Sequence, residues 1–133
     1  MAKNIKRLLI ANRGEIATRI ARACYELNIA TIGIYTYEDR FSLHRYKTDE
    51  SYRIGEKGTP LEPYLNIEKI INLALEKKVD AIHPGYGFLS ENANFAKILE
   101  ENKIKFIGAS SELIAMMGDK IQAKKIAKEN GLP

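Results

Sequence analysis

The segment with the most evident chemistry lies in the middle of the chain, from His83 to Asn92, and has the sequence HPGYGFLSEN. Two glycines flank Tyr86, after an apolar run and directly before a helix-like pattern whose first amide groups would attract anions. Such a loop can present the Tyr86 ring and backbone N–H groups to a ligand, in which case the ring is accessible to solvent. The alternative is a structural loop in which Tyr86 is packed and His83 is the hydrogen-bonded end of a strand.

A second turn with possible chemistry, Asn12-Arg13-Gly14, follows the first apolar run of the chain. It lacks the G-x-G-x-x-G spacing that lets a backbone approach a pyrophosphate closely, which disfavours a dinucleotide site. The geometry of a tight turn explains Gly14. Asn12 and Glu15 are three residues apart, so we expect them to form a capping box at the start of the next helix.

Charged side chains at two other places suggest contacts with phosphate or with another subunit. Gly118-Asp119-Lys120 would put a lysine in the first turn of a helix, where both the ammonium group and the helix dipole favour phosphate. Arg19, Arg22 and Glu26 recur at helical spacing on one face, away from the apolar positions of the same helix. A solvated surface is the alternative in both cases.

Alternating strands and helices must position these residues. Short β-rich apolar runs predict strands at 7–11, 29–35, 51–55, 79–83 and 104–107. Apolar residues spaced three to four apart predict helices, with Asn66 as the cap of the second. The apolar stripes are Ile16, Ile20, Ala23 and Leu27; Ile67, Ile70, Ile71, Ala74 and Leu75; and Phe95, Ile98 and Leu99. The alternation of strands and helices along the chain predicts an α/β fold, a Rossmann-like open parallel sheet with helices on both faces.

Two segments fit this alternation less well. The polar stretch 38–48 predicts a loop with a short helical turn, anchored by Phe41, Leu43 and Tyr46, and its role is not evident from the pattern. In the tail, helix starts are expected at Ser110 or Ser111 and at Asp119. The final Gly-Leu-Pro is typical of a connector. We therefore expect one domain over 1–117 and a connecting helix over 118–133 that leads to a further domain.

The composition is that of one soluble globular domain. The 133 residues are 45% hydrophobic and 29% charged, with a net charge of +4 spread along the chain, so nothing indicates a nucleic-acid-binding surface. No apolar run reaches the roughly 20 residues that span a bilayer, and no secretory signal is evident, so we expect a cytoplasmic protein. Cys24 is the only cysteine, which excludes an internal disulfide, and its apolar neighbours suggest a small core residue.

Three segments together, at 9–17, 83–92 and 117–120, resemble the N-terminal domain of biotin carboxylases, in the same order and at suitable intervals. Within that family the segment 44–52, HRYKTDESY, is most similar to bacterial pyruvate carboxylases. The biotin carboxylase subunits of acetyl-CoA or propionyl-CoA carboxylases are the alternative. A free-standing nucleotide-binding or dimerisation module would be a different class of protein.

The resemblance implies an ATP-dependent ligase that carboxylates biotin on a mobile carrier domain, using bicarbonate and Mg²⁺. It implies that the pre-ATP-grasp domain lies here and that an ATP-grasp domain after Pro133 holds the metal ligands and most of the nucleotide pocket. No catalytic residue or metal ligand is then expected within this chain, which would be inactive alone. The roles that the resemblance implies are biotin binding by Tyr86 and Gly87, ATP binding by Lys120, and a homo-oligomer contact through Arg19, Arg22 and Glu26.

Overall fold

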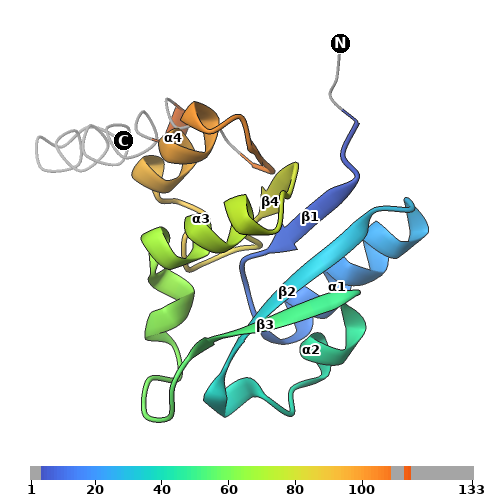
Figure 1. Ribbon diagram of the computed structural model, residues 1–133, viewed down its shortest axis with the longest axis vertical. Helices are drawn as coiled ribbons and strands as arrows, with labels where there is room; N and C mark the ends of the chain where they lie inside the picture. The colour runs from blue at the N-terminus through green and yellow to red at the C-terminus, as the bar shows by residue number, and fades with distance from the viewer. Residues whose placement is uncertain (1–3, 109–112, 115–133) are drawn as a thin grey trace, which may run out of the picture.

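The computed structural model describes residues 4–108 and 113–114, which form a five-stranded sheet with helices packed on it (Figure 1). The strands are β1 (Arg7–Ile10), β2 (Ala30–Thr36), β3 (Glu50–Gly55), β4 (Ala81–His83) and β5 (Lys105–Phe106). The α-helices are α1 (Gly14–Glu26), α2 (Leu43–Lys47), α3 (Ile67–Glu76) and α4 (Ala93–Glu101). Two short 3₁₀ helices, η1 (Tyr37–Asp39) and η2 (Glu62–Leu65), follow β2 and β3.

The strand order is β3-β2-β1-β4-β5, and every neighbouring pair is parallel. The chain moves outward from β1 through β2 to β3 and then returns to place β4 on the other side of β1. The predicted Rossmann-like α/β fold is therefore confirmed. In such sheets the point where the strand order reverses, here between β1 and β4, opens a crevice at the carboxyl ends of the strands, where ligands bind.

Helices cover both faces of the sheet (Figure 1). Alternate residues of the strands fill one core on each face. On the face covered by α3 and α4, Leu9 lies between Ile32 and Ile82 of the neighbouring strands, and all three are fully buried. On the opposite face, Leu8, Ile10 and Ala81 pack against α1. The central strands β1 and β2 read as nearly continuous apolar runs because both of their faces are covered, whereas the edge strand β3 carries polar residues.

The buried side of α1 differs from the predicted stripe. Ile20 is buried as expected, but its buried companions are Ala17, Ala21 and Cys24, whereas Ala23 and Leu27 are exposed. Small side chains bring the helix close to the sheet, so the contact face turns toward them and away from the bulky Leu27. The outward-turned residues join Ile5 and Ile107 in lining an apolar hollow of about 320 Å³. Burial raises the pKa of the Cys24 thiol, which fits its predicted role as a core residue.

Asparagine side chains cap both helices on the other face. Asn66 accepts a hydrogen bond from the backbone N–H of Lys69 at 3.0 Å, which confirms the predicted cap of α3. Asn92 caps α4 in the same way through Phe95 N–H at 2.9 Å. The helix starts expected at 110–111 and 119, and the connecting helix 118–133, lie outside the described residues. In the part of the chain that is described, no helix is long and apolar enough to cross a membrane.

Candidate functional site

The two turns singled out from the sequence meet at the switch point between β1 and β4. Asn12, only 2% exposed, donates hydrogen bonds from Nδ2 to the carbonyl oxygens of Pro84 at 2.7 Å and Tyr86 at 2.9 Å. Its Oδ1 accepts a hydrogen bond from Arg13 N–H at 2.7 Å. The predicted capping box is therefore wrong: Arg13 is the N-cap of α1 and makes no side-chain cap. Two loop carbonyls need donors in a buried place, and the Asn12 amide supplies both.

The loop after β4 is held by packing against the core and by hydrogen bonds within the loop. Phe88 packs at a tilt against Tyr64, with ring centroids 5.6 Å apart, and Leu89 is buried in the core. Gly85 N–H donates to His83 Nδ1 at 3.0 Å, and Ser90 N–H donates to the Gly87 carbonyl at 2.9 Å. A loop held in this way is a firm support for whatever lies at its tip.

Tyr86 is at that tip and is 71% exposed, so the expected accessible ring is observed and the packed alternative is wrong. The next residue, Gly87, has a φ of +69°, and a Cβ there would meet no atom within 4 Å. Within the described residues its N–H has no hydrogen-bond acceptor. The loop thus offers an exposed aromatic ring beside an unpaired backbone donor. This pair can bind a small molecule that has an apolar ring and a carbonyl oxygen.

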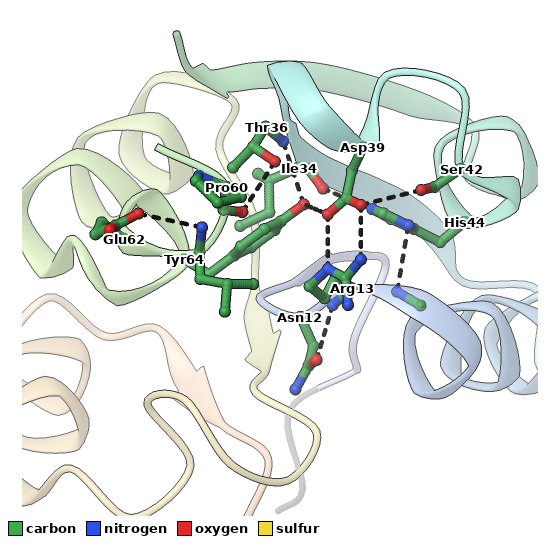
Figure 2. Close-up of polar contacts among 12 residues, drawn as sticks. Asn12, Arg13, Ile34, Thr36, Asp39, Ser42, His44, Pro60, Glu62 and Tyr64 are labelled. Carbon is green, nitrogen blue, oxygen red and sulfur yellow. Dashed lines mark hydrogen bonds and ion pairs between the residues drawn. The ribbon is translucent and has the colours of Figure 1, made fainter. Parts of the chain in front are cut away.

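A second group of side chains fixes the turn after β1 (Figure 2). Arg13 forms a two-pronged ion pair with Asp39 of η1, with Nε–Oδ2 and Nη2–Oδ1 distances of 2.7 Å each. Asp39 is 4% exposed, and Ser42 donates a further hydrogen bond to Oδ1 at 3.1 Å. Burial alone would raise the pKa of Asp39, but hydrogen bonds from Arg13, Tyr64 and Ser42 and the charge of Arg13 outweigh it and lower the pKa to about 2.

Tyr64 of η2 brings the segment after β3 into the same group. Its hydroxyl donates to Asp39 Oδ2 at 2.6 Å and accepts from Thr36 N–H at 3.2 Å (Figure 2). Burial and the adjacent carboxylate both raise the pKa of this hydroxyl, so it stays protonated and keeps donating. Segments that follow three neighbouring strands are therefore joined through one carboxylate.

His44 of α2 also supports the turn, and it is the buried residue of α2. Its ring is 1% exposed, with Nδ1 accepting from Gly14 N–H at 3.3 Å and Nε2 against the Ile34 carbonyl at 3.0 Å. These partners require a neutral ring with the proton on Nε2, and burial lowers its pKa. The anchors predicted for this segment were wrong, because all three are exposed: Phe41, Leu43 and Tyr46. Arg40 and Arg45 stack on aromatic rings there and leave His44 to point inward.

Sequence reasoning missed this Arg13–Asp39–Tyr64–His44 group, although one signal was present. Arg13 lies in a turn at the carboxyl edge of the sheet, where a cation needs a partner. Asp39 and Tyr64 follow the next two strands, whose carboxyl ends meet at the same edge. A search for carboxylates after those strands would have found Asp39.

The remaining predicted site residues lie apart from the loop. On the exposed side of α1, Arg22 pairs with Glu26 at 3.7 Å and Arg19 pairs with Glu15 at 3.0 Å. The side chains of all four residues remain largely exposed. Lys120 lies outside the described residues. Across residues 4–108 and 113–114, no three His, Cys, Asp or Glu side chains gather as metal ligands.

Comparison with known proteins gives consistent similarities. Residues 4–114 match the family described as "Biotin carboxylase, N-terminal domain". The chain is 56% identical over 131 residues to the pyruvate carboxylase of Bacillus subtilis. The match covers 98% of this chain and 11% of that protein. The chain spans about a tenth of the length of such relatives.

Solved structures give the same result. The crystal structure of the biotin carboxylase subunit of pyruvate carboxylase has a TM-score of 0.86 and 52% identity, covering 98% of this chain and 28% of that one. The biotin carboxylase domain dimer of Hydrogenobacter thermophilus 2-oxoglutarate carboxylase, in complex with MgADP, ADP and bicarbonate, has a TM-score of 0.86 and 48% identity. That match covers 99% of this chain and 29% of the solved one.

Proposed function

Because the chain belongs to the family of biotin carboxylase N-terminal domains, we propose that it is part of an ATP- and bicarbonate-dependent biotin carboxylase and that its Tyr86–Gly87 loop forms one wall of the biotin site. The similarity to pyruvate carboxylases over nearly the whole chain supports pyruvate as the final carboxyl acceptor. Because the relatives are about nine times longer, the other parts of such an enzyme would be supplied by residues beyond this chain.

One observation carries the biotin proposal: the Gly87 N–H, which has no acceptor in the part of the chain that the structure describes, lies next to the exposed Tyr86 ring at the switch point of the sheet. Biotin has a ureido group, whose oxygen accepts hydrogen bonds and whose nitrogen takes up the carboxyl group, within a compact bicyclic ring. A backbone donor and an aromatic wall suit these two features. The open space around Gly87 lets the ureido oxygen approach its amide without meeting a side chain.

The chain's own residues would then bind and orient biotin rather than perform the chemistry. Tyr86 would cover one side of the ring and keep water from it, and Gly87 would fix the ureido oxygen by one hydrogen bond. We assign nucleotide, bicarbonate and Mg²⁺ binding to the longer enzyme, in line with the ligands of the 2-oxoglutarate carboxylase domain, and we assign Lys120 a contact with ATP. The carrier domain would bring biotin to this edge of the sheet.

We assign the outer side of α1 to a contact between subunits, with Arg19, Arg22 and Glu26 as its charged residues. Two observations support this role: all three side chains are exposed, and their ion-pair partners lie on the same helix. Exposed pairs of this kind contribute little stability, so exchanging them for partners across an interface costs little.

Replacing Tyr86 by alanine in the full-length enzyme tests the proposed biotin site. We expect the KM for free biotin to rise roughly tenfold, about 1.4 kcal/mol of binding, because the aromatic wall is lost. The KM for ATP and the melting temperature should stay nearly unchanged, since the exposed ring contributes little to packing. Steady-state kinetics with free biotin and thermal unfolding give these values.

Tyr46→Ala is the matched control, because Tyr46 is also an exposed tyrosine but lies on α2. It should leave the KM for biotin unchanged. If Tyr86→Ala destabilises the protein by several kcal/mol, the size typical of emptying a packed aromatic site, and leaves biotin kinetics intact, Tyr86 has a structural role and the proposal is wrong.

A further inference from the structure

The side chain of Asn12 is the only amide in the described residues that joins the two turns of the switch point, and every polar group on it is used. Its two carbonyl partners lie 72 and 74 residues away in sequence. Carbonyl oxygens only accept hydrogen bonds, so they fix which end of the amide faces the loop. At 2% exposure, Asn12 cannot touch a ligand itself.

These hydrogen bonds determine where the loop's own N–H groups point. In a trans peptide the C=O and N–H bonds point in opposite directions. The Pro84 carbonyl faces Asn12, and the next N–H, of Gly85, accordingly lies on the other side, where it donates to His83 Nδ1. By the same geometry, the Tyr86 carbonyl facing Asn12 directs the Gly87 N–H away from the interior.

The contact is close enough to restrict the loop sequence. A Cβ on Gly85 would lie 2.6 Å from Asn12 Nδ2, and the φ of Gly85 is +66°. Asn12 is held in turn by its neighbours, because Arg13 is paired with Asp39 and Gly14 N–H is bonded to His44. The backbone that carries the amide is therefore held by the turn after β1 as well as by the loop.

We propose that Asn12 is a positioning residue of the biotin site: its amide holds the Pro84 and Tyr86 carbonyls inward and so aims the Gly87 N–H at the ureido oxygen. The step from loop geometry to biotin rests on the function proposed above. The step from Asn12 to loop geometry rests on the contacts alone.

Asn12→Asp in the full-length enzyme tests both steps. Aspartate has the same size and still accepts from Arg13 N–H through one oxygen, but its other oxygen replaces the NH₂ group and faces the two carbonyls. In hydrogen-exchange mass spectrometry without biotin, we expect the loop-bonded amides of Gly85, Ser90 and Asn92 to exchange about tenfold faster. The KM for free biotin should rise roughly tenfold, with the KM for ATP unchanged.

Asn66→Asp is the matched control, because the Asn66 cap uses only its oxygen, and it should change neither readout. If Asn12→Asp does not fold, Asn12→Ser takes its place: a hydroxyl can donate to one carbonyl, so a smaller change in the same direction is expected.

Unchanged loop exchange overturns the inference. Faster exchange with an unchanged KM for biotin also overturns it. The Tyr86→Ala variant then shows whether the positioning role alone fails or the proposed biotin site fails with it. If Tyr86→Ala still raises that KM, the proposed function survives without the positioning role. If neither variant affects biotin, the proposed biotin site fails as well.

Discussion

Asp39→Asn is expected to lower the free energy of unfolding by about 3 kcal/mol, the lower end of the cost of breaking a buried ion pair from one side. Each Asp39 oxygen accepts two hydrogen bonds, from Arg13 and Tyr64 on one and from Arg13 and Ser42 on the other. An amide therefore places its NH₂ group against two donors in either orientation. Because Arg13 is partly exposed, water can compensate it in part, which keeps the cost near the lower end.

The same variant should change the acid stability of the chain. Asp39 has a pKa of about 2 in the folded state against an ordinary value of 3.8. A lowered pKa means that its stabilisation is fully present above pH 3.8 and is lost as the pH falls toward 2. The difference in unfolding free energy between the native chain and Asp39→Asn should therefore shrink over that interval. Urea denaturation at a series of pH values measures it.

Asp49→Asn is the matched control for this change. Asp49 is exposed and accepts hydrogen bonds from the N–H and Oγ1 of Thr31, which an asparagine oxygen can still accept. Its cost should stay below about 1 kcal/mol, as is usual for an ordinary hydrogen bond. If both variants lower the free energy of unfolding equally, the Arg13–Asp39–Tyr64–His44 group stabilises the chain no more than an ordinary hydrogen bond does.

Gly85→Ala is expected to be the second costly substitution, because it combines two penalties. A left-handed φ of +66° costs an alanine about 1–2 kcal/mol. The new Cβ would also lie 2.6 Å from Asn12 Nδ2 and 3.3 Å from Ile16 Cγ1, and such overpacking typically costs about 1–3 kcal/mol. Chemical denaturation should show the sum of the two.

Gly87→Ala separates these penalties, because its φ of +69° is nearly the same while a Cβ there meets open space. Its free energy of unfolding should fall only by the cost of placing an alanine at a left-handed φ. If the two alanine variants are equally stable, the close approach of Asn12 to Gly85 does not occur in solution.

Much of the fold follows from the sequence, since the central strands β1 and β2 are compact apolar runs. The runs at 7–11 and 29–35 lie within one or two residues of β1 and β2, and the Asn66 cap was predicted from its residue type and place. The stripe on α1 was less accurate. Periodicity shows that a helix has an apolar side, but Ala23 and Ala21 are alike in sequence, and only packing on the sheet selects Ala21.

The site was only half predictable, for a reason that Asn12 makes clear. An asparagine before a helix usually caps it, and local sequence cannot show that two carbonyls from residues 84–86 compete for the same amide. The exposed Tyr86 between glycines was predictable, because its neighbours offer no side-chain cover. The position of Asp39 after β2 made it a candidate partner for Arg13, but its bond to Tyr64 and the burial of His44 were not predictable, since these contacts join three other segments of the chain.

The most direct test of the central claim is a crystal structure of the full-length protein with free biotin bound. We predict the ureido oxygen at hydrogen-bond distance from Gly87 N, about 2.7–3.2 Å, with the Tyr86 ring against the bicyclic ring and the Asn12 amide still on the Pro84 and Tyr86 carbonyls. Biotin bound away from this loop, or a Gly87 N–H directed away from it, would contradict the account.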